Sequence, residues 1–91
     1  MTPEALVKKD IKVFLSSIEG LWFFMPVPTG FGVRGIPDFI GCWRGRFFGI
    51  EAKSSEGKPT AWQEAIGRKI TLAGGLWLVV RNVDEIKHVF C

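Results

Sequence analysis

Hydrophobic residues near the start of the chain recur at the spacing of a helix. They are Val7, Ile11, Phe14 and Ile18. Intervals of three and four residues predict an amphipathic helix over residues 3–18, which ends at Gly20. The lysines of this segment fall largely off the apolar stripe and are expected on its wetter face: Lys8, Lys9 and Lys12.

The next two segments predict a strand and a loop. Residues 21–25 are continuously apolar, which predicts a strand buried on both faces. Residues 26–35 contain three glycines and two prolines, so a connection that turns sharply or lies close to another group is expected.

The middle of the chain predicts a β-hairpin over residues 38–53. Two apolar runs flank Arg44-Gly45, where glycine can supply the positive φ of a tight turn. A polar loop follows over residues 54–59, and Thr60 with Gln63 three residues later forms the capping-box pattern of a helix that runs to about Ala73.

The remaining residues predict a strand over 76–81 and a short last helix over 85–89, capped by Asn82 or Asp84. Helices interleaved with apolar strands predict an α/β protein with a mixed four-stranded sheet, in two or three layers. With 91 residues there is room for one hydrophobic core, so residues 1–91 are expected to form a single domain.

Charged residues occupy only a few positions of the predicted hairpin. Asp38 opens its first strand, and Glu51 and Lys53 close its second. Side chains two apart share one face of a strand, so two carboxylates and an ammonium are expected to converge at one end of the hairpin. Buried charges are costly without partners or a metal, and hard carboxylate oxygens suit Mg²⁺ or Mn²⁺.

The composition adds an expectation about partners. Apolar residues make up 47% of the chain and aromatic residues 13%, more than one small core can bury. Such a surplus favours a partner surface, most simply a second copy of the chain.

The formal net charge of +3 is compatible with binding to DNA, and basic residues gather in sequence near the hairpin. Phe31 could stack on a base or simply anchor its loop to the core. The basic residues are Arg34, Arg44, Arg46, Lys53 and Lys58. On charge alone, they could equally be solvated loop and edge residues that do not bind DNA.

Other function classes find little support in the sequence. The segment after Met1 lacks the pattern of a signal peptide and no apolar run approaches a membrane span, so an intracellular, cytoplasmic protein is expected. Cys42 and Cys91 show neither zinc spacing nor a disulfide framework. The single histidine, His88, lies in the last element and offers no Ser/His or Cys/His site. A two-carboxylate glycosidase would not need Lys53.

Pro37-Asp38, followed by Glu51-Ala52-Lys53, resembles the PD-(D/E)xK signature of metal-dependent nucleases. Three further features make the resemblance more specific. They are the run from Val33 to Phe39, an acidic residue in the first helix and Gln63 in the helix after the motif. Together they resemble the virus-type replication-repair nuclease (VRR-NUC) family, stand-alone members of which occur in phages and bacteria. The resemblance implies a restriction-endonuclease-like core.

The resemblance also implies a role for each matching position. Asp38, Glu51 and the Ala52 carbonyl would be metal ligands, and Lys53 the catalytic lysine. Glu4 matches the acidic residue of the first helix, which completes or steadies the metal site. It would also suit a helix N-terminus without any chemistry.

Gln63 matches the glutamine that positions water or the lysine, although the capping box alone would explain it. For Asp38, Glu51 and Lys53 together, a single buried ion pair is a weak explanation, because such a pair rarely offsets its desolvation.

The family implies cleavage of DNA phosphodiesters in DNA repair, with Mg²⁺ or Mn²⁺ as cofactor. Stand-alone members resemble small homodimers that cut branched DNA, so a resolvase of four-way (Holliday) junctions is expected. A flap or non-selective endonuclease is the alternative within the enzyme class, and a non-catalytic nucleic-acid-binding module is the alternative outside it. The residues expected to contact DNA are Arg34, Arg44, Arg46 and Lys58.

Overall fold

The computed structural model describes residues 1–30 and 32–91; the predicted role of Phe31 lies outside them. The chain forms an α/β fold around one open, mixed sheet of four strands. In chain order the elements are α1 (Pro3–Ser16), β1 (Leu21–Phe24), β2 (Phe39–Trp43), β3 (Arg46–Ala52), α2 (Ala61–Leu72), β4 (Leu76–Val80) and the 3-10 helix η1 (Val83–Ile86).

The strands lie side by side in the order in which they occur along the chain, β1-β2-β3-β4. The pairs β1–β2 and β2–β3 are antiparallel, whereas β4 runs parallel to β3 after the crossover through α2. The predicted hairpin is therefore the pair β2–β3 at the centre of the sheet. Its turn has Arg44 at φ 51° and Gly45 at φ 80°, the two positive values of a type I′ turn.

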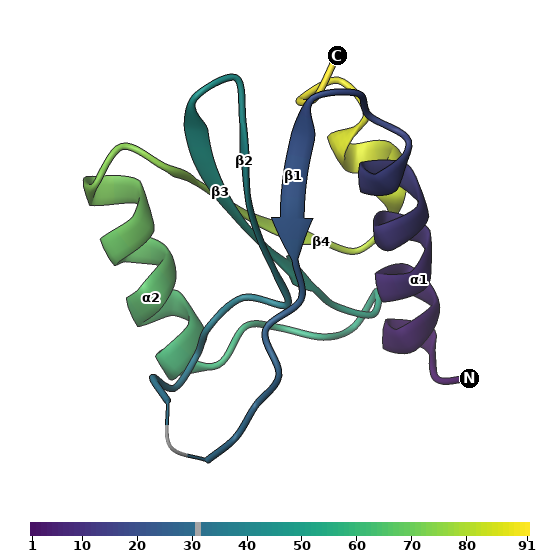
Figure 1. The fold of residues 1–91 in the computed structure, drawn as a ribbon. Coiled ribbons are helices and arrows are strands. Elements are labelled where there is room, and N and C mark those ends of the chain that lie inside the picture. The colour runs from purple at the N-terminus through teal and green to yellow at the C-terminus, as the bar shows by residue number, and fades with distance from the viewer. Residues whose placement is uncertain (31) are drawn as a thin grey trace.

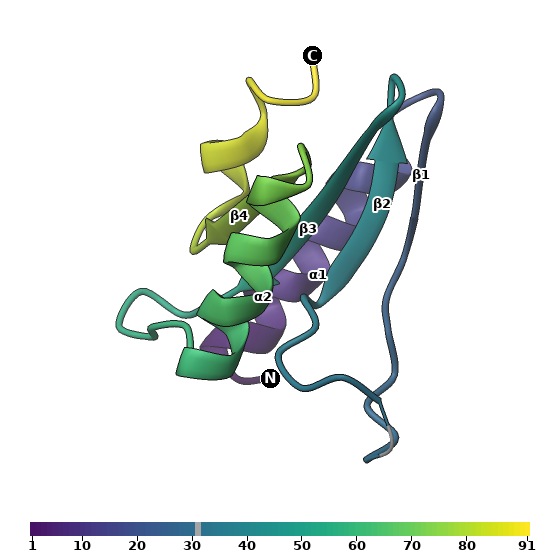
Figure 2. The same ribbon diagram turned by 90° about the vertical axis from the view of Figure 1, so that its left-hand side faces the viewer.

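The two helices cover opposite faces of the sheet, which makes three layers (Figures 1 and 2). On one face α1 buries Ile11 and Leu15 against Phe48 and Ile50 of β3, and η1 packs on the same side. On the other face α2 lies over β3 and β4. Gly67 permits this close approach, because a Cβ at that position would overlap the ring of Trp77.

The prediction that residues 21–25 are buried on both faces is wrong. β1 is an edge strand with alternating burial, and Trp22 and Phe24 are 63% and 46% exposed. Their side chains lie on the same sheet face as those of Cys42 and Ile40 of β2. α2 packs on β3 and β4 and leaves this β1–β2 part of the face uncovered. Half of one sheet face is therefore apolar and open.

Two further boundaries differ from the predictions. α1 ends at Ser16 rather than at residue 18. The next residue, Ser17, is the C-cap, and its N–H bonds to the carbonyls of Phe14 and Leu15. The last element is a 3-10 helix over 83–86 rather than a helix over 85–89, because Asn82 caps it and accepts from the Asp84 N–H at 2.9 Å. In the part of the chain that the structure describes, no helix has the length and apolarity needed to cross a membrane.

Candidate active site

The predicted acidic residues meet at the end of the sheet where β2 begins and β3 ends. Asp38 directly precedes β2, and Glu51 is the penultimate residue of β3. The pairing of Phe39 with Ile50 makes them neighbours across the hairpin. Both α1 and α2 begin near this end of the sheet (Figure 1), so the positive ends of two helices face the carboxylates.

Asp38 is held by a backbone bond and an ion pair. Its Oδ2 accepts a hydrogen bond from the Ala52 N–H at 2.9 Å, which ties the start of β2 to the end of β3. Its Oδ1 lies 3.4 Å from Nζ of Lys8, and the Asp38 side chain is 20% exposed. Asp38 is therefore fixed in place and still reaches solvent.

The Lys8–Asp38 contact corrects the expectation that Lys8 belongs to the wet face of the first helix. The sequence did contain the signal, because residues four apart share one face of a helix. Glu4 was already placed at the site, and Lys8 follows it by four residues.

Glu51 is almost fully buried and only half satisfied. The residue is 2% exposed, and its Oε1 accepts a hydrogen bond from Gln63 Nε2 at 2.9 Å. When Glu51 is ionised, its Oε2 is buried without a donor among the described residues. Burial raises the pKa of Glu51 to about 8, and so do the charge of the neighbouring Asp38 and the hydrogen bond that protonated Glu51 makes with it.

Gln63 completes the predicted capping box and also bonds to Glu51, whereas its predicted role in positioning water or the lysine stays a prediction. Its Oε1 accepts from the Thr60 N–H at 2.9 Å, and its own N–H donates to Thr60 Oγ1, which completes the capping box of α2. Its Nε2 donates to Glu51. The cap thus fixes the amide so that its nitrogen points at the buried carboxylate.

Glu4 and Lys53 lie at the edge of this pair. Both are half-buried, and the Lys53 ammonium lowers the pKa of Glu51 while the Glu4 carboxylate raises it. The Lys53 N–H bonds to the Val80 carbonyl at 2.9 Å, which fixes the backbone beside Glu51. Over residues 1–30 and 32–91, Lys53 enters no ion pair within 4.0 Å, so its ammonium is left free to meet a further anion.

The basic residues do not gather at one place, contrary to their closeness in sequence. Arg34 lies 5.2 Å from the ring centroid of Trp62 at the start of α2, and Lys58 is exposed in the loop before it. Arg44 and Arg46 lie at the hairpin turn instead. Arg46 is five residues from Glu51 and Arg44 is six from Asp38; at about 3.3 Å per residue, the backbone at these arginines is roughly 17–20 Å from that at the carboxylates.

The donor set fits a hard divalent cation bound by two carboxylates. Asp38 and Glu51 supply oxygen ligands only, and the unpartnered Oε2 is a buried acceptor that needs a positive partner. No group of three Asp, Glu, His or Cys side chains in the described segments is arranged to hold a metal. Glu4 lies near the pair, and its predicted role as a further ligand stays a prediction.

Comparisons with known proteins do not extend this description. No protein-family model matches the chain, and no curated protein matches its sequence significantly.

Proposed function

We propose that the chain is a Mg²⁺- or Mn²⁺-dependent DNA endonuclease with a restriction-endonuclease-like core. The observation that carries the proposal is Glu51 Oε2, a buried acceptor left without a partner beside a second carboxylate. Two adjacent carboxylates, one of them buried with an oxygen that no donor reaches, are stabilised when a divalent cation binds between them. The resemblance of Asp38, Glu51 and Lys53 to the PD-(D/E)xK signature supports the same assignment.

Asp38 and Glu51 would hold the cation, which when bound supplies polarisation of a phosphodiester oxygen and a lower pKa for a water molecule. Gln63 orients Glu51, and the bond from Ala52 orients Asp38, so neither carboxylate must reorganise. Lys53 orients the attacking water or stabilises the charge that develops on the phosphate. The Ala52 carbonyl and Glu4 are the remaining candidate ligands.

The open half of the sheet supports a homodimer. Trp22, Phe24 and Phe47 are large apolar side chains with 43–63% of their area exposed. Exposed apolar patches on small domains mark association surfaces. A two-fold dimer would present two active sites, which suits the symmetric nicking of a four-way junction.

The test is cleavage of matched substrates: a four-way junction, a flap and a linear duplex, each with Mg²⁺, Mn²⁺ or EDTA. Glu51→Gln removes the ionisable carboxyl group and Lys53→Ala the ammonium at the site. Glu19→Gln and Lys9→Ala make the same residue changes at exposed positions away from it and serve as controls. We expect paired nicks on the junction that disappear with EDTA and in both site variants.

Each other outcome changes the assignment in a defined way. Cutting of flaps or linear duplex by the same residues would make the chain a flap or non-selective endonuclease. Binding of junctions without any cutting would remove the catalytic role and leave a nucleic-acid-binding module. Cleavage that survives Glu51→Gln would contradict the proposed site.

A further inference from the structure

A pocket of about 220 Å³ opens at the hairpin turn, at the end of the sheet away from the carboxylates. Its walls come from Trp43, Phe48, Leu76, Val89 and Phe90. Phe48 and Phe90 form its floor; both are buried core residues, 1% and 5% exposed, with ring centroids 5.0 Å apart in an edge-to-face arrangement. The pocket thus joins the central hairpin to β4 and to the C-terminal segment.

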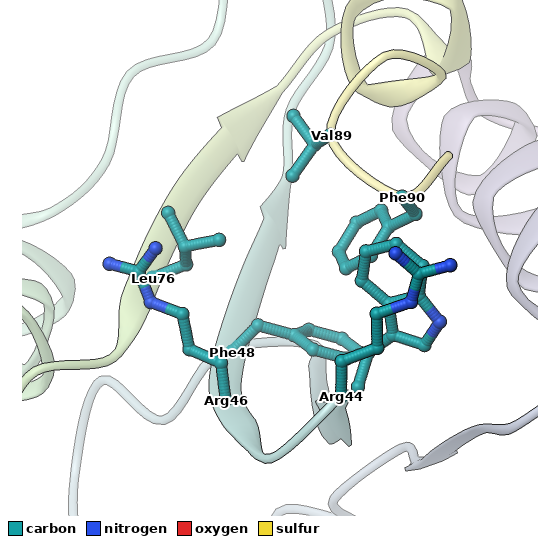
Figure 3. Close-up of a pocket in the computed structure, with 7 residues that line it drawn as sticks. Arg44, Arg46, Phe48, Leu76, Val89 and Phe90 are labelled. Atoms are coloured by element: carbon teal, nitrogen blue, oxygen red, sulfur yellow. The ribbon is translucent and has the colours of Figure 1, made fainter.

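Two arginines flank this floor. Figure 3 shows Arg44 and Arg46 on opposite sides of the pocket with Phe48 between them. Arg44 is braced by the ring of Trp43, 4.4 Å from its guanidinium carbon, and Arg46 by a bond from its Nε to the Gly74 carbonyl at 3.2 Å. A guanidinium has five donors, so most donors of both side chains stay available.

The charge of the pocket has no internal counterpart. None of the residues that line it is acidic. Neither arginine enters an ion pair within the described part of the chain. Two fixed positive charges across an apolar floor therefore call for a ligand with an apolar centre and an anion on each side.

We propose that this pocket binds one unpaired nucleotide of a DNA strand, with the base in the pocket and the two flanking phosphates at Arg44 and Arg46. A volume of about 220 Å³ suits a single planar ring system and is below the ~300–1,000 Å³ of sites for larger ligands. Trp43 is the partly exposed aromatic residue of the wall, and aromatic rings combined with basic side chains are the usual means of binding single-stranded nucleic acid.

The proposal rests on the proposed function only in taking DNA as the partner. It places a second DNA contact roughly 17–20 Å from the carboxylates along the strands, which follows from the five and six residues between the arginines and the carboxylates at about 3.3 Å each. Flaps and other substrates with a single-stranded segment offer unpaired nucleotides, whereas continuous duplex and a fully paired four-way junction do not. The pocket would therefore favour substrates with a single-stranded segment over linear duplex.

The experiment follows backbone amide shifts of the full ¹⁵N-labelled chain in EDTA, so that no cleavage occurs. The probes are a thymidine pentanucleotide, an abasic pentanucleotide with the same phosphates, and the peptide Glu-Phe-Glu. We expect the thymidine probe to shift the amides of Arg44, Arg46, Leu76 and Val89. Its affinity should exceed that of the abasic probe by about tenfold, the value of one stacked base.

Variants separate the base from the phosphates. Val89→Trp fills the pocket and should reduce thymidine affinity to the abasic level. Arg46→Gln should weaken both DNA probes and lower the salt slope by about 0.7, the value for one contact to a single strand. Lys9→Gln makes the same charge change on α1 and serves as the control, and amide dispersion verifies that each variant is folded.

Three results would overturn the proposal. They are equal affinity for thymidine and abasic probes, shifts centred on Asp38, Glu51 and Lys53 instead of the pocket, and peptide binding at the pocket amides with equal strength. Its failure is distinct from failure of the nuclease assignment. If thymidine does not bind here while metal-dependent cleavage persists, only the pocket assignment is lost; if cleavage fails and thymidine still binds, only the nuclease is lost.

Discussion

The two ends of the central hairpin carry opposite charge in opposite settings. At one end Asp38 and Glu51 are fixed by hydrogen bonds, and one carboxylate oxygen is buried without a partner. At the other end Arg44 and Arg46 are exposed around an apolar pocket. Burying a carboxylate oxygen without a donor costs a large desolvation free energy, whereas an exposed guanidinium keeps its hydration and costs little. Chemistry is therefore expected at the first end and attachment at the second.

The largest expected effect is on cleavage and is confined to the carboxylate end. Lys53→Ala should lower kcat by about 10²–10³ because it removes charge stabilisation that matters in the transition state. KM should change little, since the arginines that we assign to binding are untouched. Single-turnover rates for this variant and for Arg44→Gln provide the check. If Arg44→Gln loses as much in kcat as Lys53→Ala, the division of labour between the two ends is wrong.

The next effect is on stability and its dependence on pH. Burial, together with Asp38, raises the pKa of Glu51 from 4.5 to about 8, so the folded state binds the extra proton between these values. The free energy of unfolding should therefore be highest near pH 5 and fall by a few kcal/mol as pH rises to 8, at about 1.4 kcal/mol per pH unit.

Urea unfolding in EDTA measures this dependence. Glu51→Gln keeps the side-chain volume and carries no titratable proton, so its stability should vary much less across the same range. Glu19→Gln, at an exposed position, should behave as the wild type. A wild-type stability that rises between pH 5 and 8 would show that Glu51 is not a buried, proton-binding carboxylate.

A smaller effect separates the two functions of Gln63. Gln63→Met loses the bond to Glu51 as well as the cap, and should weaken Mn²⁺ affinity by about tenfold, as expected for groups that orient a metal ligand. Thr60→Ala removes only the cap hydroxyl that accepts from Gln63 N–H, and should cost about 1 kcal/mol of stability with unchanged Mn²⁺ affinity. Equal Mn²⁺ affinities for the two variants would reduce Gln63 to a helix cap.

The smallest effect concerns the basic residues at both ends. Replacing Arg34, Arg44, Arg46 or Lys58 by Gln should lower the salt slope of junction binding by about one unit for each residue that contacts a phosphate. Binding titrations at several salt concentrations measure the slope. An unchanged slope would remove that residue from the DNA-contacting set.

Much of the fold follows from local sequence rules. The turn at Arg44-Gly45, the cap at Thr60 and the mixed four-stranded sheet were predictable because glycine, capping residues and apolar runs act locally. The exposure of Trp22 and Phe24 was not, because an apolar run does not reveal whether a strand lies at the centre or the edge of its sheet.

The site was predictable to a similar extent. The meeting of Asp38 with Glu51 follows from pairing within the hairpin. The contact of Lys8 with Asp38 depends on how α1 docks, although the four-residue spacing from Glu4 already indicated that Lys8 lies on the same face of the helix. The distance of Arg44 from the carboxylates was predictable from the sequence, because the length of an extended strand separates residues that are close in sequence.

The central claim is that Asp38 and Glu51 bind a divalent cation, and calorimetric titration with Mn²⁺ at pH 7 tests it most directly. Because the pKa of Glu51 is about 8, its carboxyl group is mostly protonated at pH 7. The group must therefore lose its proton to the buffer when a metal binds. Titrations in buffers of different ionisation enthalpy should show close to one proton released per Mn²⁺ bound, and Glu51→Gln should lose both the binding and the release. Absence of Mn²⁺ binding, or binding that Glu51→Gln leaves intact, would contradict the account.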